Sequence, residues 1–317
     1  MSEAATGAGL EVQSSGGRLP GGAAGHDERP PVAPALVLLA SVFAVSWAGP
    51  LVRFATAPAL AISFWRLAFS CGLIGGLLLA RGEWRELRGL GRRNWLLSVL
   101  AGAFLAAHFV TWIASLELTT VAASVLLVST QPLWVALLSI PLLGERPRPV
   151  QWLGIAVAVL GAGWVGWGDL GQGIGSIRGD LLALSGAILA AFYYVLGRGL
   201  RRRMTIWPYV GVVYGAATLV LLLAILAVGT PFVGYPGTDW LVFLALAAGP
   251  MMIGHTGQNW ALRYLPAYVV NLSLLGEPVG ATLIAWVLPG IREVPPPSVL
   301  AGGGLILLGI ILGMRRR

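Results

Sequence analysis

The chain has 317 residues, of which 57% are hydrophobic and only 11% are charged, and its mean hydropathy is +0.81. A soluble domain carries about 25% charged residues, and a soluble chain this apolar would expose large apolar patches and aggregate. The composition therefore indicates an integral membrane protein. The net charge of +8 comes from 21 arginines without any lysine, and their positions argue against a nucleic-acid partner.

The first 33 residues are rich in Gly, Ala, Ser and Pro and lack hydrophobic periodicity. Such a composition is typical of a disordered segment. A signal peptide would instead place a short apolar core after an early basic cluster. We therefore expect residues 1–33 to form a disordered cytoplasmic tail.

Ten apolar stretches follow the tail, and each approaches the roughly 20 residues that a bilayer-spanning helix needs. They predict an all-α integral membrane fold with ten transmembrane helices. The single cysteine, Cys71, lies inside the second stretch, so neither an internal disulfide nor a cysteine-built metal site is expected. The expected limits are 34–52, 58–80, 95–116, 119–141, 150–168, 180–198, 208–229, 240–262, 266–288 and 298–314.

The arginines of the connecting segments fall mainly on one side of these spans. With the N-terminus in the cytoplasm, 17 arginines lie in cytoplasmic segments, 3 in outside loops, and Arg66 within a span. The positive-inside rule then predicts that both termini are cytoplasmic. We expect a multi-pass protein of the bacterial inner membrane, with the lipid bilayer as a partner of these arginines and no nucleic acid.

The two halves of the chain resemble each other at spacings of 146 to 148 residues. The matches include His108 with His255, Pro132 with Pro278, and Glu145 with Glu293. Because each half, 34–168 and 178–314, holds five spans, the second copy must enter the membrane inverted. Inverted repeats are typical of secondary transporters, whose site lies near the midplane. The pseudo-two-fold axis should pass near Gln131 and Glu277.

Several motifs resemble a known family. STQPLWVALLSIPLLGERPRP and its partner SLLGEPVGATLIAWVLPGIREVPPP are similar to the paired domains of EamA-type members of the drug/metabolite transporter superfamily. SWAGPLVRF, FWRLAFS and GDLLALSGAILAAFYYVLGR add to the likeness, which covers about residues 34–314. The resemblance implies two inverted five-helix repeats around a central cavity, and a carrier of small metabolites, often an exporter of amino acids or related compounds.

Two charged residues fall near mid-span, where a charge costs at least about 2.5 kcal/mol on insertion scales. Glu277 is either a carboxylate that binds substrate or carries a proton, or a structural partner of Arg66 or of a backbone gap. Arg66 either binds a substrate carboxylate through its guanidinium or forms a fixed intramembrane ion pair. Pro278 and its counterpart Pro132 each remove a backbone hydrogen bond, which makes them candidate hinges.

Other polar and aromatic residues share faces with these charges. His108 and Trp112 are four residues apart on one helix face, and His255 and Asn259 repeat this spacing. Structural packing is the alternative for each histidine and tryptophan. Tyr193 and Tyr194 could present aromatic surface, but core packing is the default for both. The candidate substrate-binding or cavity residues are Trp47, Arg66, His108, Trp112, Gln131, His255, Asn259 and Glu277.

Two further features are expected to have structural rather than functional explanations. Glu145 and Glu293 stand beside Arg and Pro in loops, where solvation explains them. The small-residue pairs Gly72–Gly76 and Gly309–Gly313 allow close helix approach, either within the bundle or in a homodimer.

The sequence contains no catalytic constellation and no nucleotide-binding loop, so an enzyme, a cofactor and a metal site are not expected. We predict a secondary transporter that moves a small amphiphilic metabolite outward by alternating access, with Glu277 as the candidate for proton coupling. The alternative is an intramembrane enzyme that acts on a lipid-linked substrate through Glu277, Arg66 and a histidine. The mid-depth position of these residues argues against it, because enzymes acting on lipid headgroups need their residues near one interface.

Overall fold

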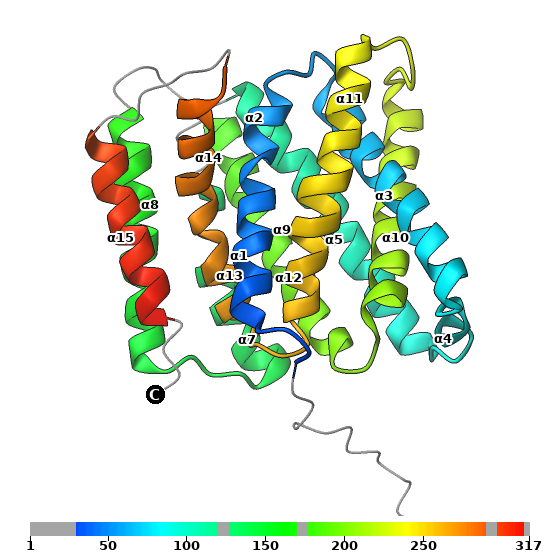
Figure 1. Cartoon of the computed structure of the whole chain (residues 1–317), viewed down its shortest axis with the longest axis horizontal. Coiled ribbons are helices and arrows are strands. Elements are labelled where there is room, and N and C mark those ends of the chain that lie inside the picture. Colours follow the sequence, from blue (N-terminus) through cyan, green and yellow to red (C-terminus); the bar gives the residue numbers. More distant parts are fainter. Residues whose placement is uncertain (1–29, 119–123, 125–126, 170–176, 290–296, 314–317) are drawn as a thin grey trace, which may run out of the picture. The chain divides into compact units, whose positions relative to one another are not determined.

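A computed structural model describes residues 30–118, 124, 127–169, 177–289 and 297–313. Most of the expected tail, and also Arg292, Glu293 and residues 314–317, lie outside this range. The described residues form helices and contain no strand. The helices, shown in Figure 1, are α1 (Pro34–Ser46), α2 (Ala48–Val52), α3 (Ala59–Arg81), α4 (Trp84–Arg88), α5 (Arg92–Leu118), α7 (Gln131–Leu143), α8 (Pro149–Asp169), α9 (Ile177–Arg201), α10 (Ile206–Val228), α11 (Gly237–Leu246), the π-helix η2 (Ala247–His255), α12 (Thr256–Ala261), α13 (Ala267–Leu274), α14 (Gly276–Val287) and α15 (Pro297–Gly313).

Seven of the ten expected spans are long and apolar enough to cross a membrane. They are Pro34–Val52, Ala59–Arg81, Arg92–Ser115, Ile177–Arg201, Ile206–Val228, Gly237–Ala261 and Ala267–Ile284. Shorter apolar helices, Gln131–Leu143, Pro149–Gly161 and Leu300–Gly313, overlap the other three expected stretches. The all-α fold is therefore confirmed, and the count of ten transmembrane helices stays a prediction.

The helices pack in pairs that correspond between the two halves of the chain. Helix α1 of the first half packs against η2 of the second half. In the same way, α9 of the second half packs against α5 of the first half. Equivalent helices also contact each other directly, α3 with α10 and α8 with α15 (Figure 1). This pairing is what two copies of one five-helix unit produce when they interlock.

Two matching hydrogen-bond clusters lie at opposite ends of the bundle. At one end, Asp239 accepts hydrogen bonds from Thr56 N, at 3.1 Å, and from Thr56 Oγ1, at 3.0 Å. At the other end, Glu86 accepts from Thr205 N, at 2.9 Å, and from Thr205 Oγ1. Thr56 lies just before α3, and Thr205 lies just before α10, the equivalent helix of the second half. Figure 1 shows α3 and α10 beginning at opposite ends of the bundle. Because the clusters lie at opposite ends, they support an inverted second copy.

Helices α8 and α15 approach closely through glycines. A Cβ on Gly154 would lie 2.5 Å from Gly313 N, and a Cβ on Gly309 would lie 2.5 Å from Ala158 N. The Gly309–Gly313 pair is therefore used inside the bundle. Gly72 has nothing within 4 Å of such a Cβ, and a homodimer stays a prediction.

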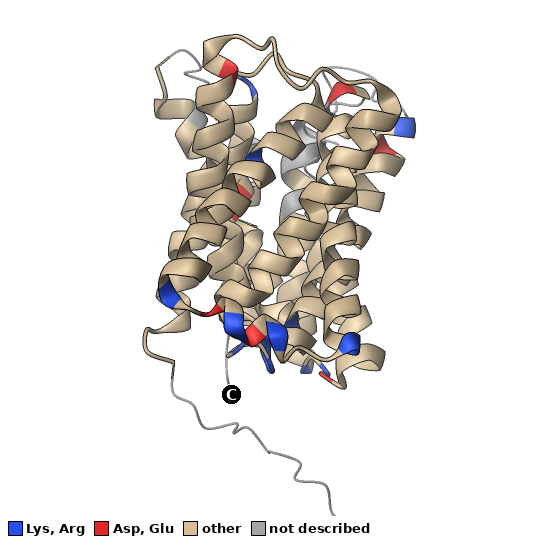
Figure 2. Ribbon diagram, turned by 90° about the vertical axis from the view of Figure 1, so that its right-hand side faces the viewer, with Lys and Arg blue, Asp and Glu red and all other residues tan. Residues whose placement is uncertain are grey.

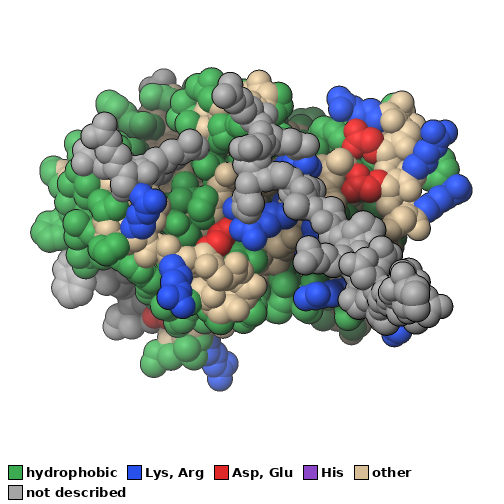
Figure 3. Space-filling view, turned by 90° about the horizontal axis from the view of Figure 1, so that it is seen from below, with side chains coloured by type: hydrophobic (Ala, Val, Ile, Leu, Met, Phe, Trp, Pro, Cys, Tyr) green, Lys and Arg blue, Asp and Glu red, His purple; other side chains and the backbone are tan. Residues whose placement is uncertain are grey.

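Basic residues gather at one end of the bundle (Figure 2), and a space-filling view onto this end shows their side chains among apolar ones (Figure 3). All of them are arginines. We call this the arginine-rich end; α1 begins here and α3 ends here. Arg201, one of the arginines counted as cytoplasmic, is only 2% exposed and donates to Asn259 O, at 3.0 Å, and to Met204 O.

Candidate functional site

Prolines interrupt the helices at mid-bundle in both halves. A proline lacks an N–H, and its ring clashes with the carbonyl four residues earlier, so a helix tends to break one turn before it. Accordingly α13 ends at Leu274 before Pro278, and α7 begins only at Gln131, next to Pro132. The two candidate hinge prolines thus lie at real breaks. A hinge motion at these breaks stays a prediction.

A third irregularity, which the sequence did not predict, is the π-helix η2 with Pro250 inside it. π-Helical turns are rare and often occur at functional sites. The proline within the eighth expected span was the available signal for this distortion. The turn ends at His255, one of the candidate site residues.

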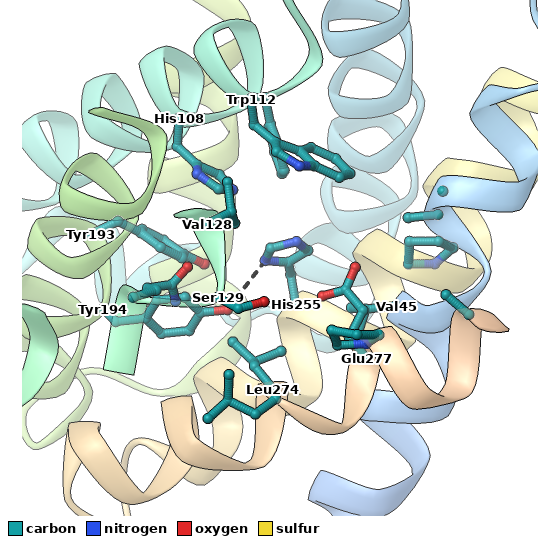
Figure 4. Close-up of a pocket in the computed structure, with 18 of the residues that line it drawn as sticks. Val45, His108, Trp112, Val128, Ser129, Tyr193, Tyr194, His255, Leu274 and Glu277 are labelled. Atoms are coloured by element: carbon teal, nitrogen blue, oxygen red, sulfur yellow. Dashed lines mark hydrogen bonds between the residues drawn. The ribbon is translucent and has the colours of Figure 1, made fainter. Parts of the chain in front are cut away.

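The interrupted helices surround a cavity of about 140 Å³. Six of the expected cavity residues and both hinge prolines line it, and Figure 4 shows several of them around the space. The lining residues are Val45, Ala48, Gly49, Arg66, His108, Phe109, Trp112, Val128, Ser129, Gln131, Pro132, Tyr193, Tyr194, Pro250, His255, Leu274, Leu275, Glu277, Pro278 and Ala281.

Arg66 is the most deeply buried charge of the cavity lining, with an exposed fraction of 1%. Its guanidinium carbon lies 4.2 Å from the centroid of the Phe109 ring, which is a cation–π contact. Its Nε and Nη1 atoms have no hydrogen-bond partner among the described residues. These two donors can therefore take an acceptor from a molecule inside the cavity.

Glu277 lies in the first turn of α14 and lines the same cavity as Arg66. In the described part of the chain, no ion pair joins the two side chains. The only described hydrogen bond at Glu277 from a side chain is a long one, 3.4 Å, from Ser46 Oγ to its backbone oxygen. The reading of these residues as a fixed intramembrane ion pair is therefore not supported, and both charges face the cavity.

Each histidine of the cavity is held through one ring nitrogen. His108 Nδ1 donates to Gly186 O, at 2.9 Å, and the ring stacks parallel to Trp112 with centroids 6.4 Å apart. His255 Nδ1 lies 3.5 Å from Tyr194 OH, the dashed contact of Figure 4. Both bonds use Nδ1, so Nε2 of each ring stays without a described hydrogen-bond partner.

Two polar contacts between helices involve residues that line the cavity. Gln131 Nε2 at the start of α7 donates to Asn271 Oδ1 of α13. Tyr194 OH of α9 donates to Gln258 Oε1 of α12. The first contact joins the two halves of the chain, and the second joins α9 to α12 within the second half.

Two expected cavity residues lie outside it. Asn259 is fully buried, and its Nδ2 atom donates to Tyr193 OH, at 2.5 Å, and to His255 O, at 2.8 Å. Trp47 stands at the break between α1 and α2, with its ring edge-on to Phe43 at 6.4 Å.

Apart from Trp112, the aromatic part of the lining was not predicted as such. Tyr193 and Tyr194 were expected to be core residues, and they are fully buried as well as facing the cavity. Phe109 was not singled out at all. Its position next to His108, and three residues before Trp112, was the only signal in the sequence.

The comparison with protein families agrees with this two-part architecture. Residues 33–167 and 177–315 each match the EamA-like transporter family. The chain belongs to this family. It is thus a multi-pass membrane transporter of small molecules within the drug/metabolite transporter superfamily. The members of this family are transporters, which argues against the enzyme alternative.

A solved structure supports the fold of this EamA-like chain. It is described only as the crystal structure of a protein, and it superposes with a TM-score of 0.73 over 89% of this chain and 96% of its own. The two sequences are 22% identical, so the likeness speaks for the fold alone. No curated protein matches the sequence.

Proposed function

We propose that this EamA-like transporter is a secondary carrier that moves a small zwitterionic metabolite, an amino acid or a related amphiphile, by alternating access. The observation that carries the proposal is that Arg66 and Glu277 line one buried cavity without forming an ion pair. A buried charge without a partner is destabilising, and a ligand that brings both opposite charges would relieve this at two places.

The chemistry of the lining suits such a ligand. A substrate carboxylate can accept a charge-assisted hydrogen bond from an unpartnered nitrogen of Arg66, Nε or Nη1. Glu277 can accept a hydrogen bond from an ammonium group, and Trp112 offers apolar surface for a side chain. A cavity of about 140 Å³ has room for about five water molecules, which is the scale of a small metabolite.

Proton coupling would follow from the same carboxylate. Among the described lining residues, Glu277 is the only acidic side chain. A proton on Glu277 removes the charge that attracts an ammonium group, so proton and substrate compete for one site. Alternating access then exchanges an entering proton for a leaving metabolite. We take the arginine-rich end as cytoplasmic, in the bacterial inner membrane, as the positive-inside rule favours.

The test is transport by the purified protein in liposomes that contain a mixture of labelled amino acids. We expect saturable efflux that an inward proton gradient accelerates. Arg66→Gln should lose most of this transport, because the substitution removes the guanidinium that contacts the substrate. Efflux that is equal for Arg66→Gln and the parent protein would rule out the proposed site.

A further inference from the structure

A group of charged side chains joins the two halves of the bundle at the arginine-rich end. Glu145, in the loop between α7 and α8, accepts hydrogen bonds from Arg198 Nε at 2.7 Å and from Arg202 Nη2 at 2.6 Å. It also accepts one from Ala267 N, at 3.3 Å. The Glu145 side chain is only 11% exposed. The expectation that its loop position leaves it solvated is therefore wrong.

The turn after α7 fixes where this carboxylate stands. Gly144 ends the helix with φ of 69°, a left-handed conformation that glycine adopts without steric cost. Gly144 N then donates to Ile140 O, and Glu145 N to Ser139 O, both at 3.2 Å. Glu145 is thus held against the end of the helix that carries Gln131 at its other end.

Arg198 extends the group to a third element. Its Nη1 atom donates to Leu262 O, at 2.6 Å, and to Arg263 O, at 3.0 Å. The last carbonyls of a helix have no partner within the helix, and here the guanidinium satisfies those that follow α12. One arginine therefore ties Glu145 of the first half to the α12–α13 connection of the second.

The joined elements also carry or adjoin residues that line the cavity. Helix α7 carries Gln131, α9 carries Tyr194, α12 follows His255, and α13 leads to Glu277. A path from the cavity to the arginine-rich end needs these helices to separate at that end. The bonds of Glu145 must break when they separate.

We propose that Glu145, together with Arg198 and Arg202, is a latch that closes the arginine-rich end of the substrate path. The inference rests on the proposed alternating-access transport, and these residues position helices without touching substrate. Charge-assisted hydrogen bonds are about twice as strong as neutral ones, which suits a contact that must hold one state closed. Arg202 is 39% exposed, so water can reach the latch and replace its bonds as it opens.

The latch is tested by thiol labelling of the cavity from each face. Ser129 lines the cavity, so Ser129→Cys in a Cys71→Ser background reports access to a membrane-impermeant maleimide. In vesicles that expose the arginine-rich end, Glu145→Gln should raise the labelling rate about tenfold. Losing one charge-assisted hydrogen bond of the closed state would raise the population of the state open to that end by about this factor. The matched control is Glu86→Gln, which makes the same charge change at the same end. Its partner, Thr205, precedes a helix without cavity residues.

A milder variant keeps the test decisive if Glu145→Gln does not fold. Arg202→Gln removes the more exposed partner and should raise labelling by a smaller factor. Labelling equal to the parent in both latch variants would overturn the latch, as would an equal rise in Glu86→Gln.

The labelling of the parent protein separates this inference from the proposed function. Labelling of the parent from both faces, with no effect of Glu145→Gln, would overturn the latch alone. Labelling of the parent and of all variants from one face only would overturn alternating access together with the latch.

Discussion

Replacing Arg66 by methionine should abolish transport without destabilising the fold. The substitution removes two buried donors that have no described partner, and each unsatisfied buried donor costs about 1–3 kcal/mol. It also removes the cation–π contact with Phe109, which is worth about 2 kcal/mol when desolvated. These effects are similar in size and opposite in sign, so the apparent Tm should stay the same or rise.

The matched control is Arg201→Met, because Arg201 is equally buried but fully engaged in the fold. It donates to the backbone oxygens of Asn259 and Met204, and hydrogen bonds from charged groups contribute about 1.5–3 kcal/mol each. The control should therefore lose at least about 3 kcal/mol of stability. The assay compares apparent Tm values of the detergent-solubilised variants with their transport rates in liposomes.

The reasoning about Arg66 depends on this contrast. If Arg66→Met lowers the apparent Tm as much as Arg201→Met does, then Arg66 is a structural residue. If Arg66→Met keeps more than about a tenth of the parent transport, the loss is below about 1.4 kcal/mol. That is less than the roughly 1.5–3 kcal/mol of one charged hydrogen bond, and Arg66 would then not bind the substrate.

Three other predictions follow from the same structure. Glu277→Gln should still exchange substrate but lose its acceleration by a proton gradient, and unchanged gradient dependence in liposomes would exclude Glu277 as the proton carrier. Impermeant reagents should label Arg88→Cys and Pro236→Cys from opposite faces of the membrane, and labelling of both from one face would contradict the inverted repeat. Gly309→Ala should lower the apparent Tm, since its Cβ would meet backbone at 2.5 Å and overpacking costs about 1–3 kcal/mol. Gly72→Ala, with open space around it, is the neutral control, and equal Tm values for the two would refute this packing.

The sequence was sufficient for features that depend on local chemistry and on repetition. Apolar length predicted the membrane helices, and the repeated prolines at positions 132 and 278 predicted matching breaks. The mid-span charges Arg66 and Glu277 predicted a polar site, since such residues are expensive in a bilayer unless they have a function. The structure brings all four residues to one cavity.

The sequence was insufficient where the partner of a side chain decides its role. Asn259 was expected in the cavity, but Tyr193 and the His255 carbonyl hold its amide. Glu145 looked like a solvated loop residue, because its partner Arg198 lies far away in sequence on another helix. Helix periodicity assigns a residue to a face, and only the packing of several helices shows what that face contacts.

Substrate protection of the cavity from both sides of the membrane is the most direct test of alternating access. Ser129→Cys should react with an impermeant maleimide in vesicles of either orientation. A transported amino acid should slow the reaction from both faces. The amino-acid concentration that halves the reaction rate should be the same for the two faces, once entry of the amino acid into the cavity is no longer limiting. Reaction from one face only, or protection by substrate from one face only, would contradict a single cavity that opens alternately to the two sides.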